Sequence, residues 1–259
     1  MHAYTNEFYN RHHPDCERSA ERIVPLLLSL FAPGSALDLG CGDGTWLKTI
    51  AAAGIGDYLG VDGGYVRPEV LQIPDERFVR HDLSLPLDLK RRFDLVLSLE
   101  VAEHLPPESA VDFVRSLTRH GDLVVFSGAI PGQYGEHHVN EQWPSYWARL
   151  FQHFGFQTYD VLRPRIWNDD AICWWYRQNM LVFATADRAS LIPVLREHES
   201  LRNSACLDIA HPGLMAFFRA TLQTNASVKL LGQKLIRLIM KRAIRMGRRV
   251  LGKRSLDHA

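Results

Sequence analysis

Three glycines at alternate positions, directly after an apolar run, constrain this chain more than any other feature. Residues 36–39 have the apolar pattern of a buried strand, Gly40, Gly42 and Gly44 follow them, and residues 45–53 are compatible with a helix. Glycine adopts backbone angles closed to other residues and lets a ligand approach the main chain. A strand, a glycine loop and a helix in this order present backbone N–H groups and the positive helix end to a ligand. The sequence therefore predicts an α/β unit with a nucleotide-type site at this loop.

The chemistry of the loop does not suit a phosphate. Its GxGxG spacing differs from the GxGxxG of dinucleotide-binding folds and from the GxxxxGK[ST] of phosphate loops. It carries no lysine to reach a phosphate, and Asp38, just before the first glycine, would repel one but suits an ammonium group. This combination resembles motif I of the class I S-adenosylmethionine-dependent methyltransferases. The resemblance implies S-adenosylmethionine, whose amino acid end replaces a pyrophosphate, as the cofactor.

Further strand ends follow in the order that this family has. Asp62 closes a second strand pattern about 20 residues beyond the loop, where nucleoside-binding α/β folds place an acid that binds ribose hydroxyls. Asp82 follows a third strand pattern and resembles the family's acid near the adenine amine. Cys41 lies inside the loop, where we expect a small side chain that fits rather than a nucleophile. The expected cofactor-binding residues are Asp38, Gly40, Cys41, Gly42, Gly44, Asp62, Asp82, Leu83 and Leu99.

Strand and helix patterns alternate through about residue 130, which predicts a parallel sheet with helices on both faces. The expected fold is α/β, with a Rossmann-like, mainly parallel, seven-stranded sheet. As in the family, the last two strands, over 156–162 and 179–185, form a pair with one antiparallel strand. The expected domains are an N-terminal helical segment at 1–34, the cofactor-binding domain at 35–186 and a helical extension at 187–259.

Composition is ordinary for a soluble globular protein. The four cysteines are scattered without a CxxC pair, which argues against a disulfide framework or a cysteine-rich zinc site. No apolar run approaches the ~20 residues that span a bilayer, and the N-terminus has no signal pattern. We therefore expect a cytoplasmic protein. Its tail could add a peripheral contact with the inner face of the membrane.

The charge of the chain is unevenly distributed. Residues 229–254 contain ten bases, and Asp257 is the only acid after residue 228, so the tail carries +9. The remaining 20 bases and 28 acids give residues 1–228 a charge of −8. The tail has the pattern of an amphipathic basic helix, which either lies on an anionic membrane or docks on the acidic body. The acidic body argues against a nucleic-acid partner.

The motif Glu100-x-x-Glu103-His104 follows the fourth strand pattern, at the edge where ligands of open α/β sheets bind. His137 and His138 follow the fifth strand and should return to the same edge. The spacing resembles metal-dependent ubiquinone-pathway O-methyltransferases and small-RNA 3′-end methyltransferases. The resemblance implies Mg²⁺, Mn²⁺ or Zn²⁺ on Glu100, Glu103, His104 and His138.

Two alternatives to the metal stay open. His104 or His137 can serve as a metal-free general base, with Glu103 among the catalytic residues. Otherwise Glu103 and His104 only cap and orient a loop.

Aromatic residues mixed with arginine and asparagine fill residues 143–147, 163–168 and 174–179. Aromatic faces stack on sugar rings and arginine reads hydroxyls, although packing accounts for about half of these aromatics. The segments resemble bacterial surface-polysaccharide-associated methyltransferases. The expected function is O-methylation of a hydroxyl on a glycan or lipid-linked saccharide, with a small-molecule or glycan acceptor. The alternatives are a small-RNA or a quinone or phenol O-methyltransferase, and a non-catalytic scaffold of the same fold.

Overall fold

The computed structural model describes residues 6–198 and 207–220, and the side chains from residue 14 onward within them. The chain divides into two compact units, Met1–His211 and Pro212–Ala259, and residues 212–220 of the second unit are helical. The first unit continues past the domain end expected at residue 186, because residues 187–198 and 207–211 belong to it. The basic amphipathic helix expected in the tail lies outside the described residues, so its membrane contact stays a prediction.

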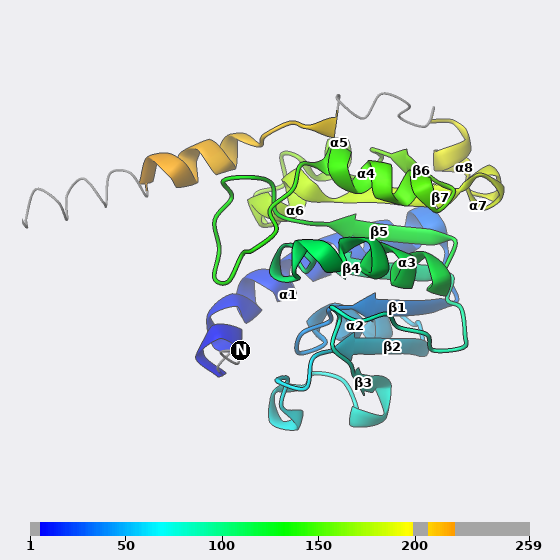
Figure 1. The fold of residues 1–259 in the computed structure, drawn as a ribbon, viewed down its shortest axis with the longest axis horizontal. Coiled ribbons are helices and arrows are strands. Elements are labelled where there is room, and N and C mark those ends of the chain that lie inside the picture. Colours follow the sequence, from blue (N-terminus) through cyan, green and yellow to red (C-terminus); the bar gives the residue numbers. More distant parts are fainter. Residues whose placement is uncertain (1–5, 199–206, 221–259) are drawn as a thin grey trace, which may run out of the picture. The chain divides into compact units, whose positions relative to one another are not determined.

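One seven-stranded sheet forms the centre of the first unit, as the sequence predicts (Figure 1). Its order is β3-β2-β1-β4-β5-β7-β6, and β7 is antiparallel to both of its neighbours. The other pairs are parallel. The strands are β1 (Ser35–Leu39), β2 (Asp57–Asp62), β3 (Phe78–Arg80), β4 (Leu95–Leu99), β5 (Leu123–Ser127), β6 (Phe156–Tyr159) and β7 (Leu181–Thr185).

Helices connect these strands. The α-helices are α1 (Asn6–Phe31), α2 (Thr45–Ala52), α3 (Ala110–His120), α4 (Pro144–His153), α5 (Arg163–Ile166), α6 (Trp174–Asn179), α7 (Ala186–Leu191) and α8 (Pro193–Arg196). The 3₁₀ turns are η1 (Pro68–Val70), η2 (Asp75–Arg77), η3 (Ala102–His104) and η4 (Pro107–Ser109). The short helices α5 and α6 have no counterpart in the sequence prediction, because each is too short to show a helical period. No helix within the described residues is long and apolar enough to cross a membrane.

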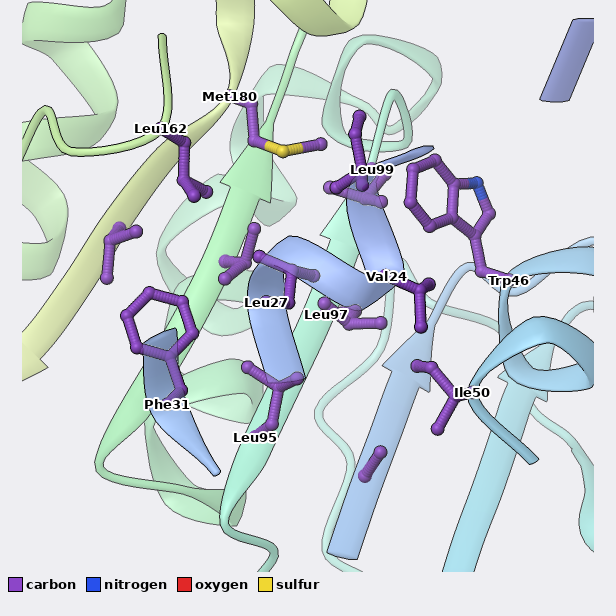
Figure 2. Close-up of a cluster of buried hydrophobic side chains, with 14 of the residues drawn as sticks. Val24, Leu27, Phe31, Trp46, Ile50, Leu95, Leu97, Leu99, Leu162 and Met180 are labelled. Atoms are coloured by element: carbon purple, nitrogen blue, oxygen red, sulfur yellow. The ribbon is translucent and has the colours of Figure 1, made fainter. Parts of the chain in front are cut away.

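Both faces of the sheet are buried, which explains why the strands read as continuous apolar runs. In β4, Leu95 and Leu97 pack on one face with α1 and α2, whereas Val96 packs on the other with α3 and α4. Figure 2 shows the first cluster, in which Leu27 of α1 lies among side chains from β4. α1 is continuous through Pro25, whose side chain is exposed. The apolar face of the helix packs on the sheet.

The strand order places the site. The chain leaves β1 for its β2 side and later returns to β4 on the other side of β1. Ligands of open α/β sheets bind at the carboxyl ends of strands where the order reverses in this way. The glycine loop after β1 and the Glu100 segment after β4 therefore meet at one edge.

We predict that Leu27→Ala costs about 2–5 kcal/mol of unfolding free energy, because Leu27 is 1% exposed and its removal leaves a cavity against the sheet. Urea unfolding measures the loss. Glu21→Ala, on the exposed face of the same helix, is the matched control and should change stability by no more than ~0.5 kcal/mol. Equal stabilities of the two variants would show that α1 does not pack on the sheet.

Candidate active site

The glycine loop needs its first and third glycines for space as well as for backbone angles. Gly40 and Gly44 have φ of +89° and +86°. A Cβ on Gly40 would lie 2.3 Å from Cγ2 of Val101, and one on Gly44 would lie 2.8 Å from Cγ1 of Ile73. Both positions therefore exclude larger residues. α2 begins directly after Gly44, as the sequence predicts.

Asp62 ties the loop to the end of β2. One carboxylate oxygen accepts from the Gly42 N–H at 2.7 Å, and the other accepts from the Gly63 N–H at 2.6 Å and from the Tyr65 hydroxyl. Burial raises the pKa of Asp62, and these hydrogen bonds, that of Tyr65 most, partly offset the rise. The Tyr65 ring covers Gly63, where a Cβ would lie 2.1 Å from Cε1. The sequence carries no sign of this role for Tyr65.

Asp38 lies at the same edge as a second buried carboxyl group. Burial, and to a smaller extent the charge of Asp62, raise its pKa to about 8. Two buried carboxyl groups that oppose each other's ionisation form a site that favours a cation. Burial also raises the pKa of Cys41 well above its usual value, which keeps the thiol neutral as expected of a packing residue.

The residues expected on the adenine side differ in their exposure. Asp82 is exposed after β3 and accepts from the Ser84 hydroxyl at 2.7 Å and the Ser84 N–H at 3.0 Å, which lower its pKa. Leu83 and Leu99 are buried. The His81 N–H donates to the Asp62 carbonyl at 2.8 Å, so the ends of β2 and β3 are joined beside the site.

Glu100 is held by amide side chains. Its backbone has a φ of +56°, and its N–H donates to the carbonyl of Ser127 at 3.0 Å. Its carboxylate accepts from Gln133 Nε2 at 2.8 Å and from Asn179 Nδ2 at 3.1 Å. Burial raises the pKa of Glu100, and the amide hydrogen bonds partly offset this. Glu100 therefore joins β4, the loop after β5 and α6.

Glu103, His104 and His138 form a cluster in which one potential ligand atom from each lies within 4.8 Å of the others. Glu100, which the sequence places with them, is not in this cluster. Glu103 is 1% exposed, and within the described residues neither carboxylate oxygen makes a hydrogen bond of good geometry. Burial, and then the charge of Glu100, raise its pKa well above the usual value.

The two histidines of the cluster lie close together, with ring centroids 4.9 Å apart. Burial, and to a smaller extent the charge of His138, lower the pKa of His104 to about 4. His104 is therefore neutral at neutral pH and offers a lone pair. His137 is exposed and has a φ of +61°, so of the two adjacent histidines it is His138 whose side chain joins the cluster.

The loop that carries His138 is attached to the turn that carries Glu103. The N–H groups of Val139 and Asn140 donate to the Glu103 carbonyl at 2.8 and 3.0 Å. Glu141 accepts from the N–H of Gly132 at 2.6 Å, from the N–H of Tyr134 at 2.8 Å and from Nδ1 of His138 at 2.8 Å. Glu141 could not be identified from the sequence, because only the folded loop brings it to His138.

Some side chains of the aromatic and arginine segments serve packing. Arg163 is 1% exposed and binds the carboxylate of Asp160 through two nitrogens, at 2.9 and 2.7 Å. Trp147 and Tyr176 are buried. Three apolar side chains on the loop of His138 or shortly after it are exposed. They are Tyr134, Val139 and Trp143.

A family model described as a methyltransferase domain matches residues 9–179. DesVI of Streptomyces venezuelae superposes with a TM-score of 0.53 at 17% identity, covering 71% of this chain and 97% of that one. The sugar N-methyltransferase KedS8 of Streptoalloteichus gives 0.54 at 14% identity, covering 71% and 94%. Magnesium protoporphyrin IX methyltransferase of Synechocystis, with bound SAH, gives 0.51 at 18% identity, covering 70% and 89%.

No curated protein matches the chain. At these identities the solved structures establish the fold, and the family model covers well over half of the chain. The glycine loop, the strand order and the matched family agree. The chain therefore belongs to the methyltransferase-domain family and is a class I S-adenosylmethionine-dependent methyltransferase.

Proposed function

We propose that this enzyme methylates an oxygen, a hydroxyl of a glycan or lipid-linked saccharide, at the edge formed by Glu103, His104 and His138. The observation that carries the proposal is the buried Glu103 carboxyl group, which makes no good hydrogen bond within the described residues and lies beside two histidines. Backbone N–H groups of Glu103 and Ala129 lower the pKa of this carboxyl group only in part. A buried polar group that is so poorly compensated is costly, so its retention points to a ligand or a reaction.

The residues at the glycine loop fit S-adenosylmethionine, which supplies a methyl group on a good leaving group, the sulfonium. Asp38 and Asp62 suit a ligand that carries positive charge, because both carboxyl groups are buried and each influence on Asp38 raises its pKa. We assign the methionine end to Asp38 and the glycine loop, the ribose to Asp62 and the adenine side to Asp82, Leu83 and Leu99. Asp62 keeps lone pairs for ribose hydroxyls beside its three protein donors.

The acceptor hydroxyl must lose its proton as the methyl group is transferred. With a pKa of about 4, His104 is a weak general base at neutral pH. A neutral imidazole next to a second imidazole and a carboxylate is instead a ligand set for Mg²⁺, Mn²⁺ or Zn²⁺. Such a cation would hold the acceptor oxygen and lower its pKa. We therefore favour the metal, with Glu103, His104 and His138 as ligands and Glu100 as an anchor of the loop.

The surface beside the cluster supports our choice of a saccharide acceptor. Tyr134 and Trp143 are 67% and 39% exposed, and aromatic faces of this kind pack against sugar rings. KedS8 acts on a sugar, although at 14% identity it supports only the fold. A phenol or quinone acceptor suits the same side chains, whereas the −8 charge of residues 1–228 opposes RNA. Transfer of labelled methyl from S-adenosylmethionine to cell-envelope saccharides, but not to phenols or RNA, would support the proposal, and the reverse pattern would overturn it.

We predict that Asp62→Ala weakens S-adenosylmethionine binding at least tenfold. A hydrogen bond to a charged acceptor contributes about 1.5–3 kcal/mol, and the variant loses both the ribose acceptor and the tie to Gly42. Calorimetry on the folded variant measures the loss. The exposed Glu76, in η2, provides the control Glu76→Ala, which should bind as the parent does. Unchanged affinity in folded Asp62→Ala would remove Asp62 from the site.

We predict that cofactor binding at pH 7 releases a proton from Asp38. With a pKa of about 8, the free carboxyl group is mostly protonated at this pH, and the cofactor's ammonium group favours the ionised form. Calorimetry in two buffers of different ionisation enthalpy counts the protons released. Asp38→Asn should bind more weakly and release none. Proton release that persists in this variant, or none from the parent, would contradict the assignment.

We predict that turnover stops when the enzyme is treated with chelator and returns with added Mn²⁺ or Mg²⁺. Glu103→Gln should abolish turnover and leave cofactor affinity nearly unchanged, because the cluster touches the acceptor. Glu108→Gln, an exposed change in the neighbouring η4 turn, is the control. Full activity after exhaustive chelation, with no metal in the purified enzyme, would favour a general base instead.

A further inference from the structure

His138 lies on a loop whose conformation is stabilised by hydrogen bonds to Glu141. Glu141 accepts three hydrogen bonds, two from backbone N–H groups of the loop and one from Nδ1 of His138. We propose that Glu141 and Gly135 position His138, fixing which ring nitrogen carries the proton and where the other nitrogen lies. The inference rests on the proposed function for its catalytic meaning, but its structural content can be tested separately.

The hydrogen bond between Glu141 and His138 determines the tautomer of the ring. A carboxylate oxygen only accepts hydrogen bonds, so Nδ1 of His138 must donate and carry the proton. In the neutral ring, Nε2 then keeps its lone pair. Histidines that bind metals or act as bases are oriented in this way, by a carboxylate or carbonyl on the opposite nitrogen.

Gly135 provides the space for the other end of the ring. A Cβ on Gly135 would lie 2.2 Å from Nε2 of His138 and 2.5 Å from its Cε1. Gly135 is not among the glycines with positive φ, so its backbone would accept alanine. The glycine is therefore needed for the position of the His138 ring rather than for the turn.

Glu141 also holds the loop in an unfavourable backbone conformation. Tyr134 and His137 have φ of +54° and +61°, a region that side-chain-bearing residues seldom adopt. Such angles persist when surrounding contacts enforce them, and they gather at functional sites. Here the contacts are the two N–H groups bound by Glu141 and the two bound by the Glu103 carbonyl. Hydrogen bonds therefore join this loop and the Glu103 turn into one unit that fixes the position of His138.

The experiment uses two variants that act on opposite ends of the ring. Glu141→Gln keeps the size of the side chain but turns one acceptor into a donor. Gly135→Ala leaves every hydrogen-bonding group in place and pushes on Nε2. The matched controls are Glu108→Gln and Gly56→Ala, since an added Cβ on Gly56 meets nothing within 4 Å and its φ is not positive.

Two readouts are measured on the full chain. Long-range ¹H–¹⁵N spectroscopy of His138 should show the proton on Nδ1 in the parent and controls, and a mixed or reversed tautomer in Glu141→Gln. Calorimetry should show that both variants lose at least tenfold in Mn²⁺ affinity, the loss expected when the partner of a ligating histidine is removed, while cofactor affinity stays unchanged. A purely structural role would lower thermal stability and leave these two readouts as they are.

The outcomes separate the inference from the proposed function. A proton on Nε2 in the parent, or variants that keep both the parental tautomer and the parental Mn²⁺ affinity, would overturn the inference. The parent enzyme could bind no Mn²⁺ and still hold His138 in one tautomer that Glu141→Gln changes. That result would end the metal proposal and support the positioning role. In that case kcat should fall in both variants with KM for the cofactor unchanged.

Discussion

The parallel pairing of β1 with β2 on one side and β4 on the other is the constraint on which the rest of the structure depends. It brings three segments that are far apart in sequence to one edge: the glycine loop, the Asp62 turn and the Glu100–His104 segment. The hydrogen bond from Gly42 to Asp62 joins the first two, and contact of Gly40 with Val101 joins the first and third. The cofactor half and the reaction half of the site are therefore assembled by the same strand order.

Several buried carboxyl groups lie at this edge, and they differ in how many hydrogen bonds they accept. Asp62 and Glu100 are compensated, the first by backbone N–H groups and the second by amide side chains. Asp38 and Glu103 are compensated far less, and burial raises the pKa of both. Buried acids without compensating hydrogen bonds or charges destabilise a protein unless a bound ligand supplies them. We propose that the cofactor's positive end binds at Asp38 and a cation at Glu103.

Local patterns were sufficient to predict the strands, the glycine loop, the position of Asp62 at the end of β2 and the sheet edge at which the motif Glu100-x-x-Glu103-His104 lies. They were insufficient where a contact depends on the path of a loop. Adjacent His137 and His138 are equivalent in sequence, and the left-handed backbone at His137 and the bond to Glu141 distinguish them. The amide partners of Glu100 come from positions 33 and 79 residues away, so no spacing rule relates them. Arginines that suggest acceptor binding are mostly paired within the fold, as Arg163 is with Asp160.

The central claim is that Glu103, His104 and His138 bind a metal ion. Anomalous diffraction at the manganese absorption edge tests it directly, on crystals grown with Mn²⁺ and S-adenosylhomocysteine. We predict one strong anomalous peak within bonding distance of Glu103 and of one ring nitrogen each of His104 and His138, with Glu100 still bound to its amides. Crystals that show the bound cofactor product but no peak at this cluster would contradict the account.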